Sequence, residues 1–136
     1  MVQLIVGKKG KGKTKQLLDK VNGAIKAAEG NIVYLDKSQK HMHELSNKVR
    51  LINVGDYPIS NCDEFLGFIS GIISRDFDIT NIFVDGIFKI VGSDNLDGFE
   101  SFLNRLETMS QKFEITFVIS VSIDAETAPD YIKKLA

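Results

Sequence analysis

The chain has 136 residues and a net charge of −1 at pH 7, with 43% hydrophobic and 26% charged residues. This length and composition predict one globular domain, residues 1–136, with its own core. The sequence shows no repeat, low-complexity tract or linker. The balanced charge provides no general attraction to nucleic acid or to an anionic membrane, although it does not exclude a nucleic acid partner.

The cysteine content and the apolar segments indicate the cellular compartment in which the protein is expected. Cys62 is the single cysteine, so the chain forms no internal disulfide and offers no Cys/His metal cluster. A reducing compartment fits this content, and we expect a cytoplasmic protein. The apolar run at residues 2–6 is too short for a secretory signal. No stretch approaches the roughly 20 apolar residues that a membrane-spanning helix needs.

Short apolar runs alternate with amphipathic helical patterns along the chain. Strands are expected at residues 2–6, 32–35, 51–54, 82–84 and 115–121. Helices are expected at residues 13–29, around Met42, Leu45 and Val49, from a capping box at Ser60 and Asp63, at 96–111, and after Pro129. Nearly continuous apolar runs suit strands that are buried on both faces. The pattern predicts an α/β fold, a three-layer αβα sandwich with a five-stranded, mostly parallel sheet.

The segment 7–14 has the sequence GKKGKGKT, which matches the phosphate-binding pattern G-x-x-x-x-G-K-[ST] at every fixed position. It follows an expected strand and opens an amphipathic helix, which is the context that this motif requires. Glycines allow backbone N–H groups to approach a β-phosphate closely, and here they are Gly7, Gly10 and Gly12. We expect Lys13 to reach the β- and γ-phosphates and the Thr14 hydroxyl to coordinate Mg²⁺.

This segment resembles the Walker A motif of the P-loop NTPase superfamily, and the resemblance implies binding of a nucleoside triphosphate. No guanine-reading N-K-x-D motif appears, so we expect ATP. The loop is rich in lysine, namely Lys8, Lys9, Lys11, Lys13 and Lys15. Apart from Lys13, these side chains either contact the phosphates or point into water. Lys8 stands where the MinD-like family has a lysine that acts across a dimer, but that family has glycine where this chain has Lys9.

The expected strand at residues 82–84 ends at Asp85 and resembles a Walker B motif, in which the aspartate holds Mg²⁺ through a water. The alternative is that Asp85 only opens a turn at Gly86. Many ATPases of the additional-strand class have a glutamate directly after this aspartate, where this chain has glycine. The apolar segment 86–92 is expected to be either a continued strand or core-packing loop, or a switch-like surface for a partner.

Asp36 directly follows the expected strand at residues 32–35. The RecA-like branch of the superfamily places its catalytic acid after this strand, so the resemblance implies that Asp36 orients or activates the attacking water. The alternative is a helix cap or turn residue. Ser120 and Ser122, near the end of the last strand, match the position of a polar γ-phosphate sensor.

The arginines lie outside any lid marked by glycine or proline; they are Arg50, Arg75 and Arg105. Phosphoryl transfer usually needs a positive group on the transition state. If that group is an arginine, we expect a second subunit or a protein partner to supply it.

Three functions fit these residues. The first is a slow, Mg²⁺-dependent ATPase of the RecA-like group that acts as an oligomer or with a partner. Asp36 supports it, as does the two-strand insertion between the strands of the two motifs. The second is a nucleotide-binding regulatory module with little or no hydrolysis, supported by the missing base after Asp85. The third is a nucleoside or nucleotide kinase, because thymidine kinase has a similar order of elements, but the sequence shows no lid.

Overall fold

The computed structural model describes residues 1–10, 12–27, 30–38, 40 and 42–136. Its strands are β1 (Val2–Gly7), β2 (Asn31–Asp36), β3 (Val49–Asn53), β4 (Ile79–Asp85) and β5 (Thr116–Ser122). Its α-helices are α1 (Lys13–Ala27), α2 (Cys62–Arg75), α3 (Ile87–Val91), α4 (Phe99–Phe113) and α5 (Asp130–Lys133). Two short 3-10 helices are η1 (Met42–Glu44) and η2 (Val54–Asp56).

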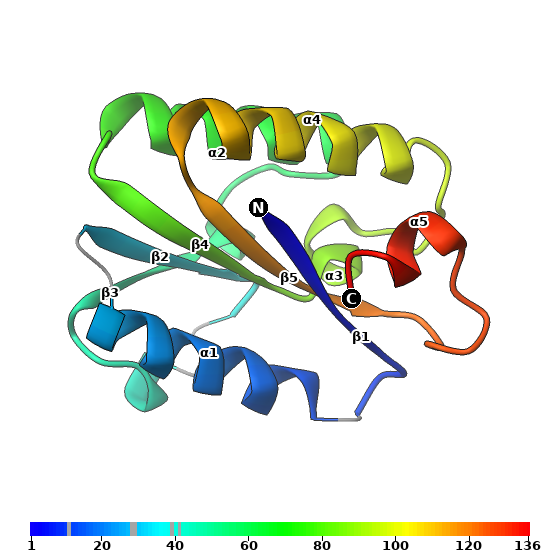
Figure 1. Ribbon diagram of the computed structural model, residues 1–136, viewed down its shortest axis with the longest axis horizontal. Helices are drawn as coiled ribbons and strands as arrows, with labels where there is room; N and C mark the ends of the chain where they lie inside the picture. Colours follow the sequence, from blue (N-terminus) through cyan, green and yellow to red (C-terminus); the bar gives the residue numbers. More distant parts are fainter. Residues whose placement is uncertain (11, 28–29, 39, 41) are drawn as a thin grey trace.

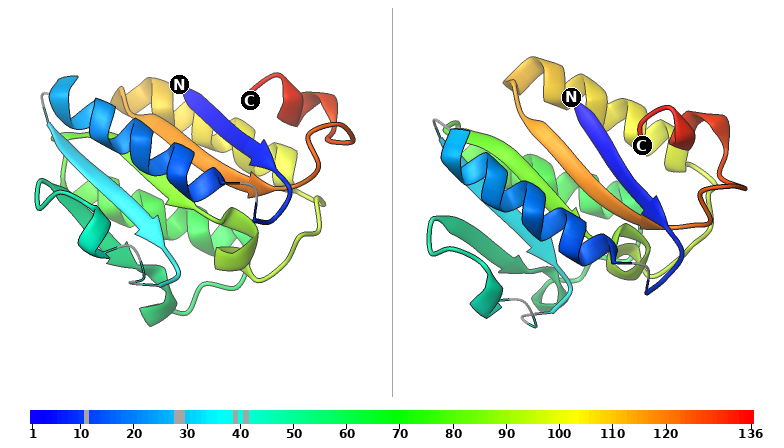
Figure 2. Two further views of the ribbon diagram at one scale, coloured as in Figure 1. Left: turned by 90° about the horizontal axis from the view of Figure 1, so that it is seen from below. Right: turned by 60° about the horizontal axis from the view of Figure 1, so that its bottom comes forward.

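The strands form one sheet in the order β1-β5-β4-β2-β3, and every neighbouring pair is parallel. Helix α1 lies along one face of the sheet, and α2 and α4 lie along the other (Figures 1 and 2). The expected three-layer αβα sandwich is confirmed, and the sheet is entirely parallel rather than mostly so. Because the strands are parallel, all five carboxyl ends meet at one edge.

Two hydrophobic cores, one on each face of the sheet, join the layers. The larger core lies on the side of α2 and α4, and the smaller core lies on the side of α1. The consecutive β4 residues Ile82 and Phe83 are both almost fully buried, and they belong to different cores. Alternate residues of a strand point to opposite faces, so a strand covered on both faces must be apolar throughout.

The prediction of a helix around residues 42–49 is wrong. Only the three-residue η1 forms there, and Val49 instead begins β3, where it pairs with Ile32 of β2. Leu45 packs against the smaller core. Pairing with a strand that is distant in the sequence outweighs a weak helical periodicity of three apolar residues. The other predicted boundaries differ from the observed ones by a few residues.

Helix α2 is capped one residue later than predicted. Asn61 is the N-cap, and its side-chain oxygen accepts a hydrogen bond of 2.8 Å from the backbone N–H of Glu64. The Glu64 carboxylate in turn accepts from the Ser60 N–H at 2.7 Å. Asn61 therefore takes the place predicted for Ser60, and the return bond from Glu64 goes to Ser60, the residue before the N-cap, rather than to the N-cap itself.

Gly30 lies against the chain that enters β4, and this contact leads to a stability prediction. A Cβ atom added at Gly30 would lie 2.1 Å from the Asp78 carbonyl oxygen and 2.8 Å from Thr80 Cγ2. We expect Gly30→Ala to lower the free energy of unfolding by about 1–3 kcal/mol, because the backbone must move. Gly23→Ala, which adds a Cβ in open space on α1, should raise it by about 0.5–1 kcal/mol. Urea unfolding of both variants tests this, and equal midpoints would contradict it.

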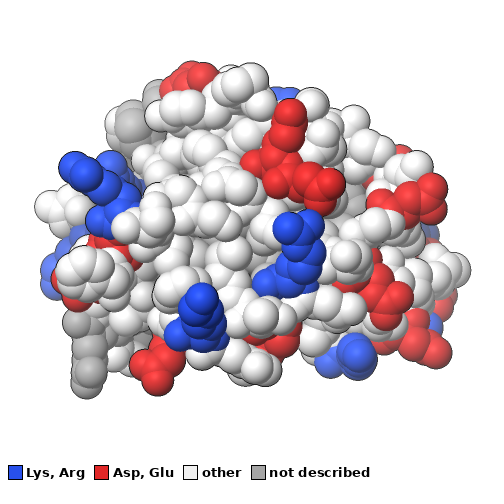
Figure 3. Space-filling view, turned by 90° about the horizontal axis from the view of Figure 1, so that it is seen from above, with Lys and Arg blue, Asp and Glu red and all other residues white. Residues whose placement is uncertain are grey.

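Acidic and basic side chains are interspersed over the face that α2 and α4 form (Figure 3). This distribution agrees with the balanced net charge of the sequence and shows no large single-sign field on that face. Within the part of the chain that the structure describes, no helix has both the length and the apolar character needed to cross a lipid bilayer.

Candidate functional site

The carboxyl edge of the sheet brings the predicted polar residues together. Gly7 ends β1 and is aligned with Ser122 of β5, and Asp36 of β2 is aligned with Asp85 of β4. Strand β5 lies between β1 and β4, so one strand separates the glycine-rich loop from Asp85. In open α/β sheets, ligands bind at this edge where the chain order changes direction.

The glycine-rich loop connects β1 to α1, which begins at Lys13 as predicted. Gly10 and Gly12 have φ angles of 82° and 78°, which L-residues with a side chain rarely adopt. A Cβ atom at either position would meet no neighbour within 4 Å, so backbone conformation rather than space requires glycine here. Lys11, which the sequence assigns to the phosphate-binding loop, lies outside the described residues.

The Lys13 side chain folds back across the loop. It is only 8% exposed, and its Nζ donates a hydrogen bond of 2.8 Å to the Lys8 carbonyl oxygen. Burial lowers the pKa of the Lys13 ammonium, and the nearby Asp85 carboxylate opposes that shift. An ammonium group has three donors, so Lys13 can bind a phosphate oxygen beside the Lys8 carbonyl or in its place.

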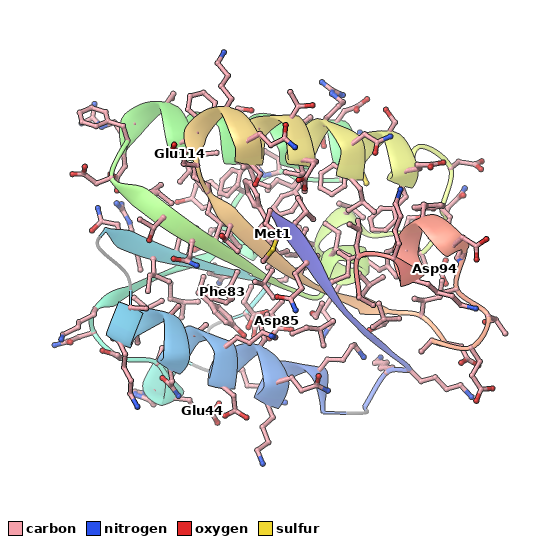
Figure 4. The ribbon with its side chains drawn as sticks, in the orientation of Figure 1. Met1, Glu44, Phe83, Asp85, Asp94 and Glu114 are labelled. Carbon is pink, nitrogen blue, oxygen red and sulfur yellow. The ribbon has the colours of Figure 1, made fainter. Side chains whose placement is uncertain are left out.

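Three hydroxyl groups from three different elements lie within hydrogen-bond distance of the Asp85 carboxylate. Figure 4 shows Asp85 between the sheet and α1. Thr14 Oγ1 at the start of α1 lies 3.3 Å and 3.2 Å from Asp85 Oδ1 and Oδ2. The Tyr34 hydroxyl donates to Oδ2 at 2.8 Å, and Ser120 Oγ lies 3.3 Å from Oδ1. Ser120 Oγ also accepts a 2.7 Å hydrogen bond from the Gly86 N–H. The two residues predicted to hold Mg²⁺, Thr14 and Asp85, are therefore in direct contact.

Tyr34 is the residue of this cluster that the sequence analysis missed. Its side chain is completely buried in the smaller core against α1. Burial, and then the charge of Asp85 and the hydrogen bond to it, raise the pKa of the Tyr34 hydroxyl above its usual range, so it stays a donor. The sequence feature that could have identified Tyr34 is its position two residues before Asp36, because residues two apart on a strand face the same side of the sheet.

Asp36 is buried, with 7% of its surface exposed, at the carboxyl end of β2. Its neighbours in the sheet are Asp85 on one side and Asn53 on the other. Its charge contributes to the raised pKa of Tyr34. The structure thus places Asp36 at the same edge as the other predicted residues, although it does not line the cleft there.

A cleft of about 780 Å³ opens above this edge. One wall is the glycine-rich loop with Lys13 and Thr14, the floor includes Asp85 and Ser120, and the far wall is α3 and the residues after it. A volume of this size is typical of sites for small molecules. On the far wall the cleft is lined by Phe88, Lys89, Gly92, Ser93 and Asp94.

The predicted phosphate-binding lysines are arranged in different ways. Lys9 lines the cleft. Lys8 Nζ lies 3.5 Å from Asp124 Oδ2, in the connection after β5. Lys15 is exposed on α1. Lys8, Lys15 and Gly7 do not line the cleft, so among the described residues Lys9 and Lys13 are the lysines of the loop that face it.

The apolar segment after Asp85 forms α3 rather than a continued strand or an exposed surface. Ile87, Ile90 and Val91 are at most 5% exposed and belong to the larger core. The interpretation of this segment as a switch-like apolar surface is therefore wrong. Its hydrophobic residues stabilise the fold, and α3 is bounded by Gly86 and Gly92, with φ angles of 79° and 74°.

No family model matches the sequence, and no curated protein is significantly similar to it. Solved structures do match the fold. One is the crystal structure of a KaiC-like protein from the hyperthermophilic archaeon Pyrococcus horikoshii, with a TM-score of 0.64 and 15% sequence identity. The match covers 98% of this chain and 66% of that protein, so this chain spans less than two thirds of its length. At this identity the similarity shows a shared fold.

Proposed function

We propose that the chain binds ATP with Mg²⁺ and hydrolyses it slowly, as an oligomer or with a protein partner. The observation that carries the proposal is the contact of Thr14 with Asp85 at the bottom of the cleft, beside the buried Lys13. A lysine, a hydroxyl and a carboxylate from two motifs that are 71 residues apart converge where a helix begins. A helix N-terminus favours bound phosphate groups.

The oxygen atoms of Thr14 and Asp85 fit magnesium. Mg²⁺ prefers hard oxygen ligands and usually keeps several waters, so it needs few protein groups beside the phosphates. Thr14 would hold the ion directly and Asp85 would hold it through a water. When bound, the metal would neutralise charge on the β- and γ-phosphates. Lys13 would bind the same phosphates, and the N–H groups of residues 7–14 would surround the β-phosphate.

Hydrolysis requires a group that orients the attacking water, and Asp36 is the proposed one. It is buried and aligned with Asp85 on the neighbouring strand. In the reaction a water oxygen forms a bond to the γ-phosphorus, the bond to the β–γ bridging oxygen breaks, and the proton of the water passes to a base. Ser120 is proposed as a sensor of the γ-phosphate, because it lines the cleft and contacts Asp85.

Asp36→Asn should leave the Kd for Mg·ATP unchanged and lower the rate of phosphate release by about 100-fold or more, in line with the usual contribution of a general base. Single-turnover phosphate release and equilibrium binding on the same preparation measure both quantities. Asp56→Asn, an exposed carboxylate in η2 at the end of β3, is a suitable control. Full turnover in Asp36→Asn would assign the base to another residue or to a partner.

The source of a positive group for the transition state is part of the proposal. None of the three arginines, Arg50, Arg75 and Arg105, is among the described residues that line the cleft. We infer that a second copy or a partner supplies an arginine there. Turnover per chain should therefore increase with protein concentration or on addition of the partner, and constant turnover over a wide concentration range would argue against self-association.

One observation favours a second function, a nucleotide-binding module without hydrolysis. The residue after Asp85 is glycine, and Asp36 does not line the cleft. The two functions are separated by measuring phosphate release from Mg·ATP by the purified chain. Saturable binding with no release above the Lys13→Ala background would favour the binding module.

A further inference from the structure

The Tyr34 hydroxyl makes a direct hydrogen bond from β2 to the carboxylate at the end of β4. The O–O distance to Asp85 Oδ2 is 2.8 Å, shorter than the distances from Thr14 and Ser120 to the same carboxylate, which are 3.2–3.3 Å. A hydroxyl that donates to an ionised carboxylate makes a stronger bond than one between neutral groups. By geometry, Tyr34 is the strongest of the three donors.

The Tyr34 side chain is packed inside the smaller core. It is 0% exposed and lies in the core that Leu17 and Val21 of α1 form with the sheet. Its neighbour on β4 is Phe83, two residues before Asp85, so the two strands fix the distance between the hydroxyl and the carboxylate. A donor anchored in this way holds its acceptor in one orientation.

The other two hydroxyl groups near Asp85, those of Ser120 and Thr14, have a second hydrogen-bond partner or a second proposed role. Ser120 Oγ also accepts from the Gly86 N–H. Under the proposed function the oxygen of Thr14 becomes a metal ligand. Tyr34 is buried and is not among the residues that line the cleft, so a ligand there does not meet its hydroxyl directly.

We propose that Tyr34 is a positioning residue for the metal-binding carboxylate of Asp85. Its hydrogen bond to Oδ2 would restrict the rotation of the carboxylate and so keep it facing Thr14 and the cleft. This inference rests on the proposed function, because it assigns Asp85 to Mg²⁺. Groups that orient a metal ligand from behind typically contribute 10- to 100-fold to metal affinity.

Tyr34→Phe removes the hydroxyl and keeps the ring in the core. We expect the Mg²⁺ concentration for half-maximal tightening of ATP binding to rise about 10- to 100-fold, while the Kd for ATP in EDTA is unchanged. The first quantity is measured by calorimetric titration of the protein with ATP at a series of MgCl₂ concentrations, and the second by the same titration in EDTA. Tyr131→Phe is the matched control, because Tyr131 is a partly buried tyrosine on α5 that does not line the cleft.

A residue with a structural role only would behave differently. If Tyr34 had a structural role only, its substitution would weaken ATP binding equally with and without Mg²⁺. Either that result or an unchanged Mg²⁺ dependence would overturn the inference. Near-UV circular dichroism and thermal unfolding of Tyr34→Phe show whether the core is intact. If the variant is less stable, the measurements are made well below its unfolding midpoint.

A double-mutant cycle tests whether Tyr34 affects Mg²⁺ binding through Asp85. In the background of Asp85→Asn, Tyr34→Phe should cause no additional loss of Mg²⁺ dependence, because the carboxylate on which it acts is gone. Additive losses would show that Tyr34 acts independently of Asp85. Absence of ATP binding by the unmodified chain would instead overturn the proposed function, and the inference with it.

Discussion

Lys13→Ala should weaken binding of Mg·ATP by about 100-fold or more, while the unfolding midpoint changes little. The lysine is predicted to make charge-assisted hydrogen bonds to two phosphate groups, and each such bond contributes about 1.5–3 kcal/mol. Its buried position beside Thr14 and Asp85 brings the charge close to the phosphates with little screening by water. Equilibrium binding of ATP measured by calorimetry is the direct test.

The control for this variant is Lys15→Ala. It removes the same side chain from the same helix, two residues away, at an exposed position outside the cleft. A general effect of positive charge on a polyanion would weaken binding in both variants and would decrease with salt. Wild-type affinity in Lys13→Ala would show that the loop does not bind phosphate as proposed.

Asp85→Asn should lose most of the contribution of Mg²⁺ to ATP binding, about 10- to 100-fold, and retain the binding that is measured in EDTA. The amide has the size of the carboxylate but no negative charge, and its NH₂ group faces hydroxyls that now donate to Asp85. Binding curves at increasing Mg²⁺ concentration separate the metal-dependent part from the metal-free part.

Asp94→Asn provides the comparison, because it removes one negative charge from the far wall of the same cleft. If only the total negative charge of the cleft affects ATP binding, both variants will change the ATP affinity in the same direction. If Asp85 is the metal-binding carboxylate, only Asp85→Asn changes the Mg²⁺ dependence. A wild-type Mg²⁺ titration for Asp85→Asn would remove this residue from the metal site.

The glycine-rich loop could be predicted from the sequence because its parts are contiguous. Gly10, Gly12, Lys13 and Thr14 are specified by local backbone needs and by the start of α1, and all of them line the cleft. The parallel sheet could be predicted for a similar reason, since strands buried on both faces are apolar throughout. Asp85 could be placed because it ends such a strand.

Features that depend on contacts between distant segments could not be predicted. Tyr34 appears in the sequence as one more bulky residue of an apolar strand, and its partner Asp85 is 51 residues away. Val49 appears to continue a helical pattern until its pairing with β2 is known. The segment after Asp85 is apolar in any arrangement, and only its packing against the larger core identifies it as interior.

The bond between Lys13 and the Lys8 carbonyl has a consequence for which anions the loop prefers. An ammonium that already has a partner within the protein gains from a ligand only the difference between two interactions. A ligand with one phosphate offers Lys13 little beyond what the carbonyl provides. A chain of phosphates reaches the lysine, the loop amides and the Thr14 region at once, and its ends are tethered to each other. Under the proposed function, we therefore expect weaker binding of monophosphates and inorganic anions than of triphosphates.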